Sequence, residues 1–411
     1  MKINKHCFPN GLRLVHYEDT STQMVALNIV YDVGARDEHP EHTGFAHLFE
    51  HLMFGGSAHI PDYDTPLQLA GGENNAWTNN DITNYYLTVP KPNIETAFWL
   101  ESDRMLELAF SEQSLEVQRG VVMEEFKQRC LNQPYGDMGH LFRPLAFRVH
   151  PYRWPTIGKE LSHIEQATLD EVKSFFYRFY APNNAVLAVT GNISWDETVK
   201  LTEKWFAPIP RRDVPVRQLP QEPEQTQERR LTVERNVPLD ALFMGYHMCS
   251  REGADYYAFD ILSDILSNGR SSRLNRRLVQ EENIFSGIDA YISGTRDAGL
   301  LQISGKPAAG VSLEQAEAAV RKELEELQRS PVDGQELEKV KNKFESTQIF
   351  GNINYLNVAT NLAWFELTGK AEDIDLEVER YRSVTTEQLH TVAQRTFCES
   401  NAVVLYYKSD K

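Results

Sequence analysis

Residues 44–56 read Gly-Phe-Ala-His-Leu-Phe-Glu-His-Leu-Met-Phe-Gly-Gly. No proline interrupts this stretch and two glycines end it, which predicts a short helix. Its apolar residues cover most of the helix circumference, and His47, Glu50 and His51 share the remaining arc. His47 and His51 are one turn apart on the same face, so their imidazoles can chelate one metal ion. Without a cation, burying these groups would cost several kcal/mol, and the stretch therefore indicates a metal site.

A second helix, expected over residues 111–131, offers a third ligand. Leu115 and Phe126 belong to the stripe that this helix buries. Glu125 lies on one flank of the stripe, whereas Glu124 points nearly to the opposite side. Of the two adjacent glutamates, we therefore expect Glu125 to reach inward and Glu124 to be a solvated helix charge.

Two imidazoles and a carboxylate are typical ligands of a catalytic zinc ion, which keeps one further position open. His47, His51 and Glu125 would hold one zinc ion per chain, although manganese or cobalt would also fit such ligands. Glu50 would then be the general base that takes a proton from the attacking water and passes it to the leaving amine of a peptide.

Length and charge narrow the class of protein. The chain has 411 residues and a net charge of −17, and its length suits two domains of about 200 residues each. The negative charge argues against nucleic acid and anionic membranes as partners. No run of about 18 apolar residues is present, so we expect no membrane span. The start of the chain has no apolar signal core, which favours a cytoplasmic protein, or a periplasmic one if a leader has been removed.

Four scattered cysteines, at positions 7, 130, 249 and 398, form neither a disulfide framework nor a cysteine zinc site. Residues 207–230 are rich in proline and polar side chains and read as a linker. We therefore expect a catalytic domain over residues 1–206 and a second domain over residues 231–411.

The second half repeats the first. Residues 168–186 align with residues 385–403 without a gap, with identical residues at Thr168/Thr385, Arg178/Arg395, Asn184/Asn401, Ala185/Ala402 and Val186/Val403. Near the start of each half, a predicted strand leads into a predicted helix. If these two helices correspond, the positions of His47, Glu50 and His51 are taken in the second half by Phe259, Leu262 and Ser263. The second half is therefore expected to keep the fold and to lack the metal site.

The H-x-x-E-H order is the inverzincin signature. The chain resembles the M16 (pitrilysin or insulinase-like) metallopeptidases, in particular their short bacterial members, which look like the mitochondrial processing peptidase. The resemblance covers nearly the whole chain, with matching segments at residues 44–54, 75–86, 121–125, 150–158, 180–184 and 269–274.

This resemblance implies an α+β fold of two homologous domains, each a mostly antiparallel sheet covered by helices on one side. It also implies a zinc endopeptidase acting on short or unfolded peptides. Two chains would enclose a chamber, either as a homodimer or as a heterodimer with another M16 chain. The peptide would add a strand to a sheet edge, and Asn75, Ala76 and Trp77 would provide that edge.

Three positions depart from the family pattern. Gln118 stands where a glutamate is frequent seven residues before the third ligand, and it is a candidate for a supporting residue near the metal. Val279 and Ser286 align with an arginine and a tyrosine that contact substrate in many members. The missing arginine and tyrosine keep open a non-catalytic or partner-dependent peptide-binding subunit. A structural zinc protein is less favoured, because structural sites usually close with four protein ligands.

Overall fold

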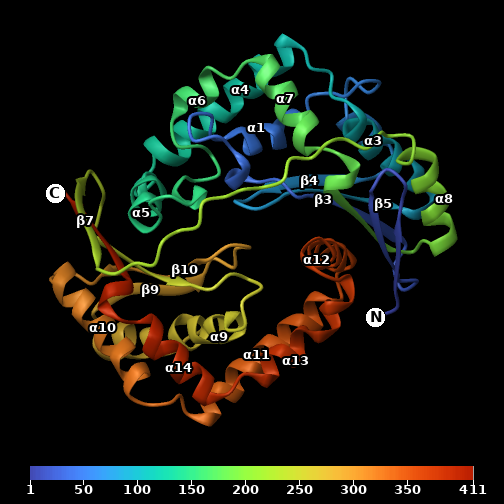
Figure 1. Ribbon diagram of the computed structural model, residues 1–411. Coiled ribbons are helices and arrows are strands. Elements are labelled where there is room, and N and C mark those ends of the chain that lie inside the picture. Colours follow the sequence, from blue (N-terminus) through green and yellow to red (C-terminus); the bar gives the residue numbers. More distant parts are fainter. Residues whose placement is uncertain (411) are drawn as a thin grey trace. The chain divides into compact units, whose positions relative to one another are not determined.

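The computed structural model describes residues 1–410, which form two compact units (Figure 1). Unit 1 consists of Met1–Gln128, Trp154–Leu219 and Ile349–Leu376. Unit 2 consists of Arg129–Arg153, Pro220–Gln348 and the residues from Glu377 onward. The units are thus not two contiguous parts of the chain, because each takes up a segment from the opposite half of the sequence. The passage from Leu219 to Pro220 falls inside the predicted linker.

Unit 1 contains a six-stranded sheet in the order β1-β2-β6-β3-β5-β4. The pair β2–β6 is parallel, and all the other pairs are antiparallel. The strands are β1 (Ile3–Cys7), β2 (Arg13–Glu18), β3 (Met24–Tyr31), β4 (Glu73–Thr78), β5 (Thr83–Pro90) and β6 (Ala185–Gly191). The helices are α1 (Phe45–Leu52), α2 (Asp64–Leu69), α3 (Ile94–Leu106), α4 (Glu112–Phe126), α6 (Leu161–Glu165), α7 (Leu169–Phe179), α8 (Trp195–Trp205) and α12 (Tyr355–Thr368).

Helices cover both faces of this sheet. On one face, α1, α4 and α7 contribute to a large apolar core that includes Leu27, Phe49 and Phe176 (Figure 1). On the other face, Val30 and Ala188 pack with residues of α12. The expectation that helices cover one side only is therefore wrong. All seven residues of β6 are buried, and a strand buried along its whole length requires cover on both faces.

Unit 2 contains a five-stranded sheet in the order β7-β11-β8-β10-β9. The strands are β7 (Arg229–Arg235), β8 (Ala241–Met248), β9 (Phe285–Ile292), β10 (Gly299–Pro307) and β11 (Ala402–Ser409). The helices are α5 (Met138–Ala146), α9 (Tyr256–Ser267), α10 (Leu313–Arg329), α11 (Gly334–Gly351, which ends just inside unit 1), α13 (Glu377–Ser383) and α14 (Thr386–Thr396). Here too a helix from the opposite half of the sequence covers the second face of the sheet. This helix is α5, whose Phe142 packs with Val403 and Leu405 of β11.

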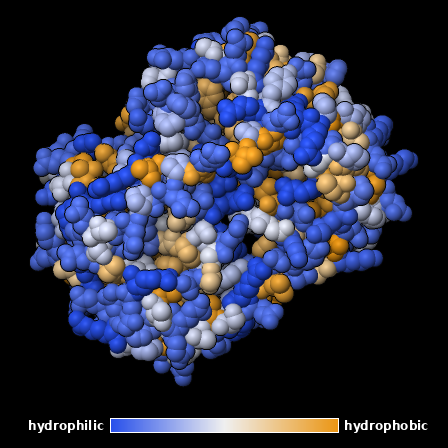
Figure 2. All heavy atoms as spheres, in the orientation of Figure 1, coloured by the Kyte–Doolittle hydropathy of each residue, from blue (hydrophilic) through white to orange (hydrophobic). Residues whose placement is uncertain are grey.

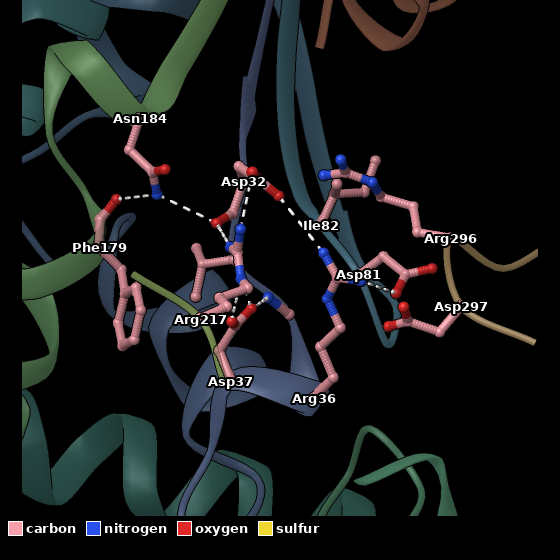
Figure 3. Close-up of polar contacts among 12 residues, drawn as sticks. Asp32, Arg36, Asp37, Asp81, Ile82, Phe179, Asn184, Arg217, Arg296 and Asp297 are labelled. Carbon is pink, nitrogen blue, oxygen red and sulfur yellow. Dashed lines mark hydrogen bonds and ion pairs between the residues drawn. The ribbon is translucent and has the colours of Figure 1, made fainter. Parts of the chain in front are cut away.

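The predicted repeat is present strand for strand. The order β2-β6-β3-β5-β4 matches β7-β11-β8-β10-β9, with the parallel pair in the same place. Asn184 donates from Nδ2 to the carbonyl oxygens of Phe179 and Asp32, at 2.8 and 3.0 Å (Figure 3). Its counterpart Asn401 donates from Nδ2 to the carbonyls of Thr396 and His247, at 3.0 and 3.1 Å. The identity of these asparagines therefore reflects a shared structural role.

The face shown in Figure 2 is mostly hydrophilic, with apolar residues in small groups. Among the described residues, no helix combines the length and the apolar character needed to cross a bilayer.

Candidate metal centre

Helix α1 begins after Gly44, whose φ of 87° is in the left-handed region. A Cβ at this position would lie 2.8 Å from Ile164 Cδ1 and 2.9 Å from the Ile157 carbonyl oxygen, so glycine is required on both grounds. The apolar residues of α1 are buried as predicted, including Phe45, Leu48 and Phe49. His47 is buried, and Glu50 and His51 are partly exposed, so the polar arc of the helix is accessible at its edge.

Helix α4 presents the third candidate ligand. Ser111 caps it by accepting a hydrogen bond from the Ser114 amide, and the predicted stripe of Leu115, Val122 and Phe126 is buried. The side chain of Glu125 is 18% exposed, whereas that of Glu124 is 56% exposed and lies 3.7 Å from Lys127. The chain continues from α4 into a π-helical turn over Lys127–Leu131, two residues after Glu125.

Three ligand atoms from α1 and α4 converge. Nε2 of His47 and Nε2 of His51 lie 3.6 and 3.4 Å from Oε2 of Glu125. We call His47, His51 and Glu125 the trio, and their ligand atoms all lie within 4.8 Å of one another. Four ligands placed about 2.0–2.1 Å from a tetrahedral zinc ion are about 3.3 Å apart, so the observed separations fit zinc. Within residues 1–410, this is the one group of three or more potential ligands found close enough to hold an ion.

Glu50 lies on the same helix, beside His51. Burial raises the pKa values of Tyr85 and Tyr180, and the charge of Glu50 adds to both shifts, which places Glu50 near these two phenols. Tyr85 also donates from its hydroxyl to the Phe49 carbonyl of α1, at 3.2 Å. The candidate base Glu50 therefore lies on a helix that packs against the aromatic residues of the core.

The predicted supporting residue and the predicted peptide-binding residues lie on α4 and β4. Gln118 is partly buried on α4, and a Cβ on Gly55 would lie 3.8 Å from its Cγ, so it borders the turn after α1. Asn75, Ala76 and Trp77 lie on β4, which is an edge strand that pairs only with β5 and lies beside α1.

The positions in the second half that depart from the family pattern belong to unit 2. Val279 is partly buried against the core of that unit, and Ser286 on β9 donates a hydrogen bond to the Lys306 carbonyl at 3.1 Å. On α9, Phe259 and Leu262 are buried, and Ser263 donates to the Asp260 carbonyl. No group of metal ligands was found among the described residues of unit 2.

One residue that contacts α1 was missed from the sequence. Both carboxylate oxygens of Glu38 accept backbone N–H groups at the start of α1, from Gly44 and Ala46. Burial raises the pKa of this carboxyl to about 8, and the two N–H donors act in the opposite direction by stabilising the charge. Glu38 stands six residues before Gly44, outside the spacing of a capping box, so no local pattern marks it.

Two family models match the chain. The model described as "Insulinase (Peptidase family M16)" matches residues 13–135, which include the trio, and "Peptidase M16 inactive domain" matches residues 166–344. Among curated relatives, the zinc protease PqqE of Helicobacter pylori is 26% identical over 405 residues, covering 97% of this chain and 91% of that protein. The uncharacterized zinc protease YmxG of Bacillus subtilis is 25% identical over 406 residues, covering 98% of each.

Solved structures share the fold. The crystal structure of a protease from Helicobacter pylori superimposes with a TM-score of 0.94 at 26% identity, covering 99% of both chains. A structure from Pseudomonas fluorescens, described as a peptidase M16 inactive domain, has a TM-score of 0.90 at 16% identity, which supports the fold alone. The two-unit α+β architecture predicted from the sequence is therefore confirmed.

Proposed function

Because the chain belongs to the M16 family of peptidases, we propose that it is a zinc-dependent endopeptidase that hydrolyses short or unfolded peptides. The observation that carries this proposal is the convergence of His47, His51 and Glu125 at ligand separations that suit zinc. The relatives named zinc proteases support the choice of metal.

In this proposal each polar side chain of the centre has one task. His47, His51 and Glu125 hold the ion, which when bound polarises the scissile carbonyl and makes a water molecule acidic. Glu50 takes a proton from the attacking water as the water oxygen bonds to the carbonyl carbon. It then passes this proton to the leaving nitrogen as the C–N bond breaks.

The substrate is proposed to extend β4. One edge of β4 has no partner strand among the described residues, and this strand lies beside α1. The backbone N–H of Ala76 donates to the side-chain oxygen of Asn75 at 2.8 Å, so a side chain of the strand itself now occupies this donor. An added peptide strand would replace that contact with a main-chain hydrogen bond. Such pairing recognises the extended backbone and leaves side-chain specificity loose.

A second candidate function is a peptide-binding subunit that needs a partner chain for turnover. Val279 and Ser286 favour it, because they stand where many M16 members carry an arginine and a tyrosine that contact substrate. Assembly into a homodimer or heterodimer around a chamber, and a cytoplasmic or periplasmic location, stay predictions that belong with either function.

The test combines metal analysis with cleavage of an unbiased peptide library, mapped by mass spectrometry. We expect about one zinc ion per chain, cleavage that a chelator abolishes, and recovery when zinc is added back. Cleavage that survives complete removal of metal would contradict the proposal. Zinc binding without turnover until a second chain is added would favour the subunit function.

A further inference from the structure

Helix α1 has eight residues, and little in its own sequence fixes its position. The first N–H groups of a helix have no carbonyl partner within it, and Gly44 has no side chain with which to cap them. A helix this short is not stable alone, so its orientation depends on groups outside it. The two imidazoles of the metal centre depend on that orientation.

Glu38 supplies the missing cap from outside the helix. Its Oε2 accepts the Gly44 N–H and its Oε1 accepts the Ala46 N–H, each at 2.9 Å. The residue is 6% exposed. Because both oxygens accept N–H groups, the geometry is that of the ionised carboxylate, a form that the positive end of a helix favours and that burial alone would disfavour. These two hydrogen bonds hold the backbone directly before His47.

The loop that carries Glu38 is itself fixed (Figure 3). Arg217 donates from Nη1 to Asp32 Oδ2 at 2.8 Å and from Nε to Asp37. Asp37 also accepts the Gly34 N–H at 2.9 Å. Because Asp37 directly precedes Glu38, these bonds determine where the Glu38 carboxylate can lie.

Further contacts hold the same loop on its other side. Arg36 lies 3.3 Å from Asp81, and the indole of Trp154 donates to the Ala35 carbonyl at 2.9 Å. The capping carboxylate is therefore presented by a loop with several independent anchors in unit 1, and not by a free chain segment.

We propose that Glu38 is a positioning residue of the metal centre, which orients α1 so that His47 and His51 face Glu125. This inference rests on the proposed zinc site. Metal ligands tolerate displacements of only about 0.2 Å, so a small rotation of α1 weakens binding even when the protein stays folded. The role differs from general stabilisation, because it acts on the metal affinity and not only on unfolding.

The test compares three variants for zinc affinity, by competition with a chelator, and for thermal unfolding without metal. Glu38→Gln keeps the shape and loses one of two acceptors, and Glu38→Ala loses both. Thr385→Ala is the matched control, because Thr385 caps α14 in unit 2 by accepting the Gln388 N–H, and α14 carries no metal ligand.

We expect Glu38→Gln to weaken zinc binding about tenfold, as removal of a group that orients ligands typically does, and Glu38→Ala to weaken it further. Thr385→Ala should lower the unfolding temperature and leave zinc affinity unchanged. If Glu38→Gln binds zinc as tightly as Thr385→Ala does, the positioning role is wrong. If the unmodified protein does not bind zinc, the proposed function fails instead, so the two failures can be told apart.

Discussion

Adjacent glutamates at the end of α4 show how far a single residue can be predicted. Helical periodicity assigns Glu125 to the inner flank and Glu124 to solvent, and the structure places them so, at 18% and 56% side-chain exposure. The role of Glu125 as a ligand stays a prediction, because placement alone does not show that it binds an ion.

Exchanging these two residues for alanine separates the roles. Glu125→Ala should weaken zinc binding more than about hundredfold, beyond the loss seen when a group that merely orients a ligand is removed. Glu124→Ala should bind zinc like the unmodified protein, because its carboxylate faces Lys127 and water. Metal analysis after dialysis measures both. Full zinc content in Glu125→Ala together with loss in Glu124→Ala would reverse the assignment.

Glu38 marks the limit of prediction at the same scale. The periodicity of a helix concerns residues within it, and a capping box spans three residues. Glu38 reaches α1 only because the loop of residues 32–38 folds back, held by Arg217 from far along the chain. A contact of this kind depends on the tertiary path, and the sequence contains no local signal for it.

Among the strands and helices, β4 has a proposed function because one of its edges has no partner strand among the described residues. The glycines and asparagines of residues 71–81 indicate either a sheet edge or the rim of a hairpin, and β4 is an edge strand that pairs with β5. The helix predicted over residues 111–131 is α4 followed by a π-helical turn. Apolar periodicity cannot distinguish these two backbone geometries over a single turn.

Proline substitution tests whether peptides pair with β4. Ala76→Pro removes the N–H that now contacts Asn75 and that would meet an added strand. We expect KM for peptides to rise roughly three- to tenfold, the loss of about one hydrogen bond, with zinc content unchanged. Glu73→Pro, at the first residue of the strand, is the control, because proline is tolerated there. Equal KM values for the two variants would argue against strand addition.

For the whole molecule, the duplication could be predicted from the sequence. That α12 and α5 each cover a sheet formed by the opposite half of the sequence could not be predicted. Matching residues such as Asn184 and Asn401 identified the repeat, and the two sheets have the same strand order. The fully buried run of β6 was a signal for cover on both faces. Nothing local in the sequence of α12 indicates which sheet it covers, because an apolar helix face fits either one.

A substitution in α12 that creates a cavity tests the assignment of this helix to unit 1. Leu362 is fully buried in the cluster on the second face of the unit 1 sheet, so Leu362→Ala should cost about 2–5 kcal/mol. Relative to the unmodified protein, the variant should show faster amide hydrogen exchange in β3 and β6 of unit 1, with a smaller change in β8 and β11 of unit 2. Leu376→Ala, at a 42% exposed position, should change little. Faster exchange confined to unit 2 would contradict the assignment of α12.

The central claim is that the trio holds zinc and that Glu50 moves the proton. Glu50→Gln removes the base and leaves the three proposed ligands in place. The most direct measurement is therefore zinc content and peptide hydrolysis on the same samples of Glu50→Gln and unmodified protein. We predict about one zinc ion per chain in both, with hydrolysis reduced by at least about a hundredfold in the variant. A variant that binds zinc and still cleaves peptides at the unmodified rate would contradict the account.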